Sequence, residues 1–132
     1  MANAVDAQGQ VFRNGSLTML ARVVGADAAD ITQSDISTAT YSVYLLDDED
    51  PDSRTAITGH EDESITVSAL IYDTLQTDDL WSVDTTGYNF AHVLDVSTYD
   101  AFPVAGAEYL VEFKLTPATG QVIVVRFKVR AI

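Results

Sequence analysis

The stretch AEYLVEFKLTPATGQVIVVRFKVR, residues 107–130, decides the fold class. In its first half, apolar and polar residues alternate, so that one face of a strand carries Tyr109, Val111, Phe113 and Leu115. The second half alternates in the same way, which is the pattern of a half-buried strand. The link PATG predicts a hairpin loop, because proline presets a turn dihedral and glycine adopts the left-handed conformation. The stretch therefore predicts an antiparallel β-hairpin.

The register of this hairpin is left open by the sequence. A four-residue loop that pairs Thr116 with Gln121 would put Phe113 on the same face as Val124. One extra residue, for example in a β-bulge, would put Phe113 on the face of Val125 and keep the two apolar faces together. The two registers bury opposite faces of the last strand.

The rest of the chain also reads as short strands separated by turns. Strand-like runs are QVFR (10–13), SLTMLARVV (16–24), ISTATYSVYLL (36–46), ESITVSALIY (63–72), LWSVD (80–84) and YNFAHVLDV (88–96). Asn14-Gly15, between the first two runs, is a strong hairpin signal. Single helical turns are predicted in TQSD (32–35) and VSTYDAFP (96–103). About seven to eight short strands with little helix indicate an antiparallel β-sandwich or barrel.

Length and composition predict a single domain over residues 1–132, with residues 1–9 as a mobile N-terminal tail. A chain of this size buries roughly two-thirds of the surface that it exposes when unfolded. The N-terminus lacks the basic start and apolar run of a signal peptide, and no stretch is long and apolar enough for a membrane span. The absence of cysteine excludes disulfides and thiolate chemistry.

The net charge is −13, from 20 acidic against 7 basic residues. Such a field repels phosphate backbones and anionic lipids, so neither nucleic acid nor a membrane is expected as a partner. Seventeen of the acidic residues lie from Asp27 to Asp100, where Arg54 is the only basic residue. Four of the seven basic residues lie near the C-terminal end, namely Lys114, Arg126, Lys128 and Arg130.

Asp48, Asp50 and Asp52 alternate in the way that opens a calcium-binding loop. Such a loop needs glycine at its sixth position for the sharp turn and a bidentate glutamate at its twelfth. Ser53 and Gly59 occupy these two positions here. We therefore interpret the segment as a solvated connection between strands and predict no metal site.

An irregular calcium site is the alternative for this segment. It would draw further oxygen ligands from Asp47 or from Glu61–Glu63, since calcium accepts varied oxygen donors.

His60 and His92 are the only histidines, and neither has a second nitrogen or sulfur ligand at metal-binding spacing. We expect both to be structural residues of the core or sheet. The sequence contains no nucleophile elbow and no phosphate-cradling glycine loop. We therefore predict no catalytic residues, no cofactor and no enzyme activity, although a small hydrolase would need only a histidine beside a serine and a carboxylate in a cleft.

Four aromatic residues have two interpretations. Tyr72, Trp81, Tyr88 and Tyr99 could form a platform on which sugar rings stack. The other interpretation is that Trp81, flanked by Leu80 and Val83, anchors the sandwich core, as a lone tryptophan usually does. We predict that Trp81 is a core residue.

The segment AGAEYLVEF (105–113) resembles the tyrosine corner of immunoglobulin-like domains, in which a tyrosine that starts the penultimate strand bonds back to the preceding connection. Gly106, Tyr109 and Val111 are the matching positions. The resemblance implies an immunoglobulin-like sandwich in which the Tyr109 hydroxyl bonds to backbone between Tyr99 and Val104. The chain departs from antibody-type domains, because it lacks the cysteine pair and because its tryptophan comes late.

The run YDTLQTDDLWSVDTTGYNF, together with the later FP and EYLVEFKLT, resembles small proteins encoded among phage and prophage structural genes. The resemblance covers about residues 17–130 and rests on the spacing of tryptophan, Gly-Tyr-Asn and tyrosine. It implies a location in the virion or in the cytoplasm of the producing cell. It transfers no functional residue.

The predicted function is a non-catalytic structural or assembly module of a phage or prophage particle, which binds other particle subunits or copies of itself. The alternative is a carbohydrate- or calcium-binding module of a surface or secreted assembly, which a row of exposed aromatics beside Asp48–Asp52 would favour.

The final strand of the chain is the predicted contact surface. We expect Arg126, Lys128 and Arg130 to form a basic strip at a sheet edge, where the C-terminal hairpin borders a subunit contact. The other interpretation is that Glu112 and neighbouring acids neutralise the strip within the sheet.

Overall fold

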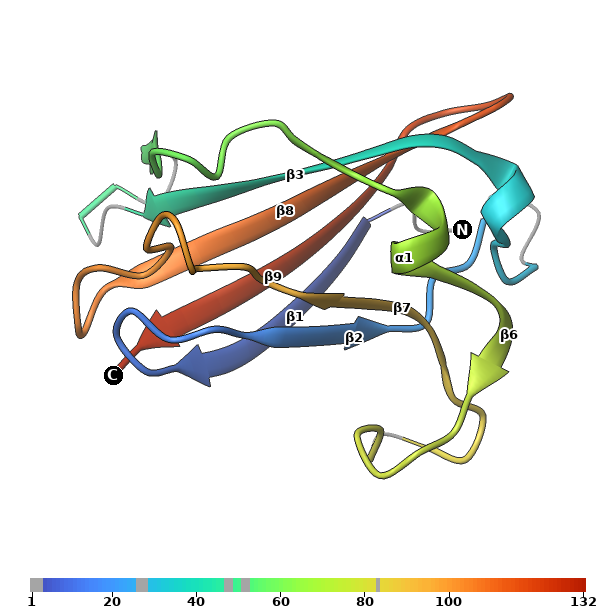
Figure 1. Ribbon diagram of the computed structural model, residues 1–132, viewed down its shortest axis with the longest axis horizontal. Coiled ribbons are helices and arrows are strands. Elements are labelled where there is room, and N and C mark those ends of the chain that lie inside the picture. The colour runs from blue at the N-terminus through green and yellow to red at the C-terminus, as the bar shows by residue number, and fades with distance from the viewer. Residues whose placement is uncertain (1–3, 26–28, 47–48, 51–52, 83) are drawn as a thin grey trace.

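The computed structural model shows an all-β protein built from two sheets (Figure 1). It describes residues 4–25, 29–46, 49–50, 53–82 and 84–132. These residues form nine strands, β1 to β9, at Ala4–Val11, Thr18–Ala21, Ile36–Leu46, Arg54–Ala56, Glu63–Ile65, Ile71–Gln76, Tyr88–Val93, Glu108–Pro117 and Ile123–Ala131. The same residues include a 3-10 helix, η1 (Gln33–Asp35), and one turn of α-helix, α1 (Val67–Leu70). Neither of these described helices has the length or apolar character needed to cross a membrane.

The larger sheet has the strand order β1-β9-β8-β3-β4, and β5 also pairs with β3. The smaller sheet has the order β2-β7-β6. β1 runs parallel to β9, and the other strand pairs are antiparallel. The sheets pack through apolar side chains, and Phe90 of β7 lies edge-on to Phe113 of β8 with 4.9 Å between ring centroids. The predicted all-β sandwich is confirmed, with nine described strands in place of about seven to eight.

The β8–β9 hairpin adopts the register that keeps the two apolar faces together. Phe113 pairs with Val125, and Leu115 pairs with Ile123, so the extra residue lies in the loop. All four of these side chains are buried. The alternation predicted for residues 107–130 is therefore the one that the sandwich uses, because only this register buries one face of each strand in the same core.

The predicted tyrosine corner is present around Tyr109. Its side chain is fully buried, and its hydroxyl accepts a hydrogen bond of 2.8 Å from the backbone N–H of Val104. The same hydroxyl donates to the Val104 carbonyl at 3.4 Å. The ring of Phe102 stands edge-on to Tyr109. The connection before β8 is thus fastened to the core by one side chain.

The predicted N-terminal tail is in large part a strand. Residues 4–9 belong to β1, which pairs residue by residue with β9 from Ala4↔Val124 to Val11↔Ala131. Residues 1–3 lie outside the described part of the chain. The sequence did not indicate this pairing, because the partner strand lies more than a hundred residues away.

Asn14-Gly15 forms a turn but not a hairpin. Asn14 adopts φ of 59°, as the signal requires, and the N–H of Gly15 bonds to the carbonyl of Phe12 at 2.8 Å. However, β1 belongs to the larger sheet and β2 to the smaller one. The turn therefore carries the chain from one sheet to the other, since turn chemistry fixes a reversal locally but does not choose the strand partners.

The run ESITVSALIY is not one strand. β5 pairs with β3 in the larger sheet, α1 follows, and β6 then pairs with β7 in the smaller sheet. Leu70 and Ile71 are adjacent and both fully buried, which a strand with one wet face does not allow. The helical turn is the crossover that puts both side chains into the core.

Of three further local predictions, one is confirmed and two are wrong. TQSD forms η1 as predicted, but VSTYDAFP forms no helix. There the Asp95 carboxylate accepts hydrogen bonds from both the backbone N–H and the hydroxyl of Ser97, which favours a local turn over a helix. The described residues of the run LWSVD, 80–82 and 84, form no strand where one was predicted.

Candidate functional site

The acidic segment after β3 lies largely outside the described residues. Asp47, Asp48 and Asp52 are not described; Asp50 is exposed, and its carbonyl accepts the N–H of Ser53 at 2.9 Å. In the part of the chain that the structure describes, no three histidine, cysteine or acidic side chains group in a way that could hold a metal ion. Glu61 and the neighbouring acids through Glu63 are exposed.

His60 is buried, and both of its ring nitrogens have partners. Nε2 lies 2.8 Å from the carbonyl of Tyr99, and Nδ1 lies 2.8 Å from the hydroxyl of Tyr41. Because a carbonyl only accepts, Nε2 carries the hydrogen and Nδ1 accepts the hydroxyl hydrogen. Burial, followed by the nearby charges of Glu63 and Asp95, raises the pKa of Tyr41. His60 is therefore a satisfied core histidine, as predicted.

His92 lies on β7 between the rings of Tyr41 and Phe113, each 5.4 Å from its own. Its Nε2 is buried and has no hydrogen-bond partner among the described residues. Burial lowers the pKa of His92, because a charged imidazole is poorly solvated there. Its position fits a neutral ring packed in the sheet.

Three of the four candidate aromatics come together beside the connection between β6 and β7. Tyr88 is buried, with the ring of Tyr72 edge-on at 5.9 Å and the ring of Trp81 at 5.7 Å. Tyr72 and Leu80 are exposed, Leu80 to 66%, and Trp81 is half-buried. We call Tyr72, Leu80 and Trp81 the aromatic platform. The prediction that Trp81 anchors the core is wrong, because Trp81 rests on the outside of Tyr88.

Tyr99 does not belong to the aromatic platform. It lies against Gly59, where an added Cβ would come within 2.3 Å of the Tyr99 ring. Figure 1 shows the β6–β7 connection at the bottom right and the end of β3 at the upper left. The aromatic platform is thus not beside the end of the strand from which the acidic segment departs.

The β6–β7 loop, residues 77–82 and 84–87, is organised by the carboxylate of Asp84. Its Oδ1 accepts hydrogen bonds from the indole N–H of Trp81 at 2.9 Å and from the backbone N–H groups of Thr86 and Gly87 at 3.0 and 3.1 Å. Its Oδ2 forms an ion pair of 2.7 Å with Arg22. These donors, the Trp81 indole foremost, hold the pKa of Asp84 well below its usual range.

A second carboxylate, that of Asp78, fastens the other side of the loop. It accepts the N–H of Leu80 at 3.0 Å through Oδ1 and the hydroxyl of Tyr88 at 2.7 Å through Oδ2. The hydrogen bond to Asp78 raises the pKa of Tyr88 to about 12, since the phenol donates to an anion. The loop that bears Leu80 and Trp81 is therefore held at both ends by hydrogen bonds to a carboxylate.

Asp78, Asp84 and Arg22 were not singled out from the sequence. The spacing Asp84-Thr-Thr-Gly87 carries the signal, because aspartate bonds the backbone N–H groups that follow it in a turn. Gly87 has φ of +106°, and a Cβ there would lie 2.4 Å from the carbonyl oxygen of Gln76. Nothing local to the sequence indicates that Arg22, 62 residues earlier, completes the arrangement.

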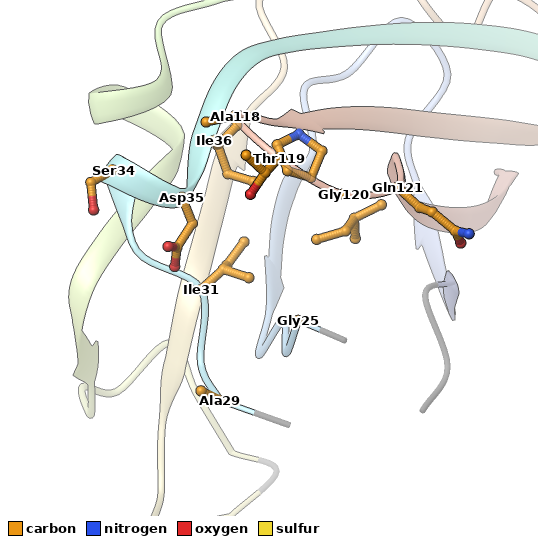
Figure 2. Close-up of a pocket in the computed structure, with 12 residues that line it drawn as sticks. Gly25, Ala29, Ile31, Ser34, Asp35, Ile36, Ala118, Thr119, Gly120 and Gln121 are labelled. Atoms are coloured by element: carbon orange, nitrogen blue, oxygen red, sulfur yellow. The ribbon is translucent and has the colours of Figure 1, made fainter. Parts of the chain in front are cut away.

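A hollow of about 660 Å³ lies between the η1 turn and the tip of the β8–β9 hairpin (Figure 2). Asp35 is the only ionisable residue among the described residues that line it. The Asp35 carboxylate already accepts hydrogen bonds from the backbone N–H and the hydroxyl of Thr32. Ser34, Thr119 and Gln121 also line the hollow, so its polar lining carries no charge besides that of Asp35.

The predicted basic strip is not at a sheet edge, because β1 covers β9. Arg130 pairs with Glu108 at 3.1 Å, while Glu112 is buried and lies 3.6 Å from Arg54. The guanidinium of Arg54 also lies over the ring of Tyr44. Glu108 thus offsets the charge of Arg130 within the sheet, as the second interpretation predicts, whereas Glu112 pairs with Arg54, which is not part of the strip.

In comparisons with known proteins, no protein-family model, curated protein or solved structure matches the chain.

Proposed function

We propose that this chain is a non-catalytic binding module that docks onto a neighbouring protein in an assembled particle. The observation that carries the proposal is the aromatic platform. It presents Tyr72 of β6 together with Leu80 and Trp81 of the β6–β7 loop, which Asp78 and Asp84 already hold in place.

Order in the loop favours binding. A surface that is ordered before contact loses less conformational entropy when the partner arrives. Tyrosine and tryptophan are also the residues most enriched among those that dominate binding energy at protein interfaces. Leu80, next to Trp81 in the chain and exposed to 66%, adds apolar surface to the same loop.

The partner surface is defined by the surroundings of the platform. Asp73, Asp78, Asp79 and Asp84 lie in β6 and the β6–β7 loop, and Arg22 pairs with one of them. An apolar pocket with lysine or arginine at its rim would complement both the platform and its acidic border.

We also propose that the sandwich belongs to the immunoglobulin-like class. Support comes from the order β2-β7-β6 in one sheet and β9-β8-β3-β4 in the other, which parallels the B-E-D and G-F-C-C′ orders of that class. The Tyr109 corner agrees with it. A phage or prophage particle as the assembly rests on the resemblance in sequence alone.

A carbohydrate ligand is the second candidate, because Tyr72, Trp81 and Tyr88 do converge. Sugar recognition also needs polar groups that are available to hydroxyls. Oδ1 of Asp84 already accepts three hydrogen bonds, and both oxygens of Asp78 have donors. This arrangement favours a protein partner over a sugar.

Fluorescence of Trp81 tests the proposal, because Trp81 is the only tryptophan of the chain. Titration with purified products of neighbouring genes should shift its emission and saturate. Leu80→Asp should abolish the shift, whereas Val122→Asp, a change at another exposed apolar side chain, should leave it intact.

Two outcomes would contradict this function. Binding that Leu80→Asp leaves unchanged would place the interface elsewhere. A saturable response to oligosaccharides, with none to proteins, would establish the second candidate instead.

A further inference from the structure

The open edges of the two sheets differ in how well they are protected. The outer side of β3 is covered by β4 and β5, which are three residues long each. The outer side of β6 is covered at its start by η1: the Gln33 side chain donates to the Ile71 carbonyl, and the Gln33 N–H donates to the Asp73 carboxylate. β2 is an edge of four residues. β1 is an edge of eight residues and pairs with β9 alone among the described strands.

The backbone of β1 presents hydrogen-bonding groups on its open side. The carbonyl of Val11 accepts the N–H of Ile132 at 2.8 Å, so Val11 faces β9. Backbone groups alternate in direction along a regular strand, and the β1–β9 register is continuous. The N–H and C=O groups of Asp6, Gln8 and Gln10 therefore point away from β9, to the open side.

The sequence of β1, AVDAQGQV, lacks the usual devices that prevent edge-to-edge pairing. It contains no proline, lysine or arginine, and Asp6 is its only charged residue. The shorter edge pieces β4, β5 and β6 each carry a charged residue. The edge strand β2, TMLA, carries no charged residue but is only four residues long, so β1 is the longest edge among the described strands, with one charged residue in eight.

We propose that two copies of this chain pair antiparallel along β1, with Gln8 opposite Gln8 across a two-fold axis. In this register the outward groups of Asp6 face those of Gln10, so no like charges oppose one another. An edge strand is self-complementary under two-fold symmetry, which makes a second copy the simplest occupant.

Charge favours a second copy at this edge. Two bodies of charge −13 repel each other, but Arg126, Lys128 and Arg130 all lie on β9, the strand next to β1. Contact along β1 therefore brings together the least acidic sides of the two copies. A strand pair alone makes a small interface, so the dimer is weak and is strengthened by salt, which screens the remaining repulsion.

Cross-linking tests this register, because the chain contains no native cysteine. Gln8→Cys would place two thiols on a hydrogen-bonded pair about 5.5 Å apart between Cα atoms, within the range that a disulfide spans. Mild oxidation should give a covalent dimer at a rate that rises with protein concentration. Ser64→Cys, at an exposed position of β5, should give far less.

A second variant separates pairing from folding. Gln8→Pro removes an N–H that points away from β9, so it should weaken self-association at least about tenfold in sedimentation experiments, with little change in thermal unfolding. Ala7→Pro removes an N–H that faces β9 and should lower stability. Equal cross-linking of Gln8→Cys and Ser64→Cys, or a monomer at every concentration and salt, would overturn the proposal. The proposal would also be overturned if Gln8→Cys formed disulfides only with a different protein.

Discussion

The β8–β9 hairpin and the β6–β7 loop are both well-defined, but they are held by different interactions. The hairpin buries Tyr109, Val111, Phe113 and Leu115 in the core between the sheets. The described residues of the β6–β7 loop contribute nothing to that core, and two carboxylates hold the loop through hydrogen bonds and one ion pair.

This difference bears on function. Burial of apolar side chains resists changes in pH and salt, so the hairpin forms a stable base. Hydrogen bonds to exposed carboxylates add little to global stability, yet they fix local conformation. A binding surface built in this way is ordered without being part of the core, so its residues can change with the partner while the fold is maintained.

The largest expected effect is that of Phe113→Ala. The Phe113 ring is fully buried and packs on Phe90 and Phe127. Its removal leaves a cavity and should lower the free energy of unfolding by about 3–5 kcal/mol, measured by denaturant titration. A loss below about 1 kcal/mol would mean that the hairpin is not the base of the core.

Tyr109→Phe should have a smaller effect. It removes one hydroxyl that bonds both the N–H and the carbonyl of Val104. We expect a loss of about 1 kcal/mol in the free energy of unfolding, which is the net value of such a bond. An unchanged unfolding midpoint would argue against the corner as a fastening of the connection before β8.

His92 should make stability depend on pH. Its pKa in the folded protein lies below the ordinary value of about 6.5, so the unfolded chain takes up a proton first as the pH falls. Stability that is fully present above pH of about 6.5 is therefore lost as the pH falls toward the folded pKa. In His92→Phe, the unfolding midpoint should change less between neutral pH and about pH 5 than it does in the unchanged protein. An equal slope of unfolding midpoint against pH in the unchanged protein and in His92→Phe would contradict this role.

Asp84→Ala should have the smallest effect on global stability and the clearest local one. It removes the acceptor of Trp81, Thr86 and Gly87. Trp81 emission should move to longer wavelength, while the unfolding midpoint changes far less than in Phe113→Ala. Asp79→Ala, in the same loop, is the matched control and should leave the emission unchanged.

The two regions also differ in how far the sequence predicts them. The alternation over residues 107–130 specified a strand pair, and Tyr109 specified its corner, because both signals are local and repeat along the strand. The register of the β8–β9 hairpin is not specified in this way, because two loop lengths satisfy the same local pattern and only the packing of the core selects between them.

The aromatic platform was not predictable in the same way. A lone tryptophan between Leu80 and Val83 has the sequence pattern of a core residue. Trp81 nevertheless lies outside the core, because the hydrogen bonds of Asp78 and Asp84 fold the loop back on itself. The ion pair with Arg22 spans 62 positions. β1 was likewise mistaken for a tail, because a parallel partner leaves no turn signal beside it.

Backbone relaxation by NMR, compared between the two regions, tests the central claim most directly. If hydrogen bonds to Asp78 and Asp84 preorganise the platform, residues 78–82 and 84–87 should show order parameters of about 0.85, equal to those of β8 and β9. Values below about 0.6 in the loop, beside rigid strands, would contradict a preformed binding surface.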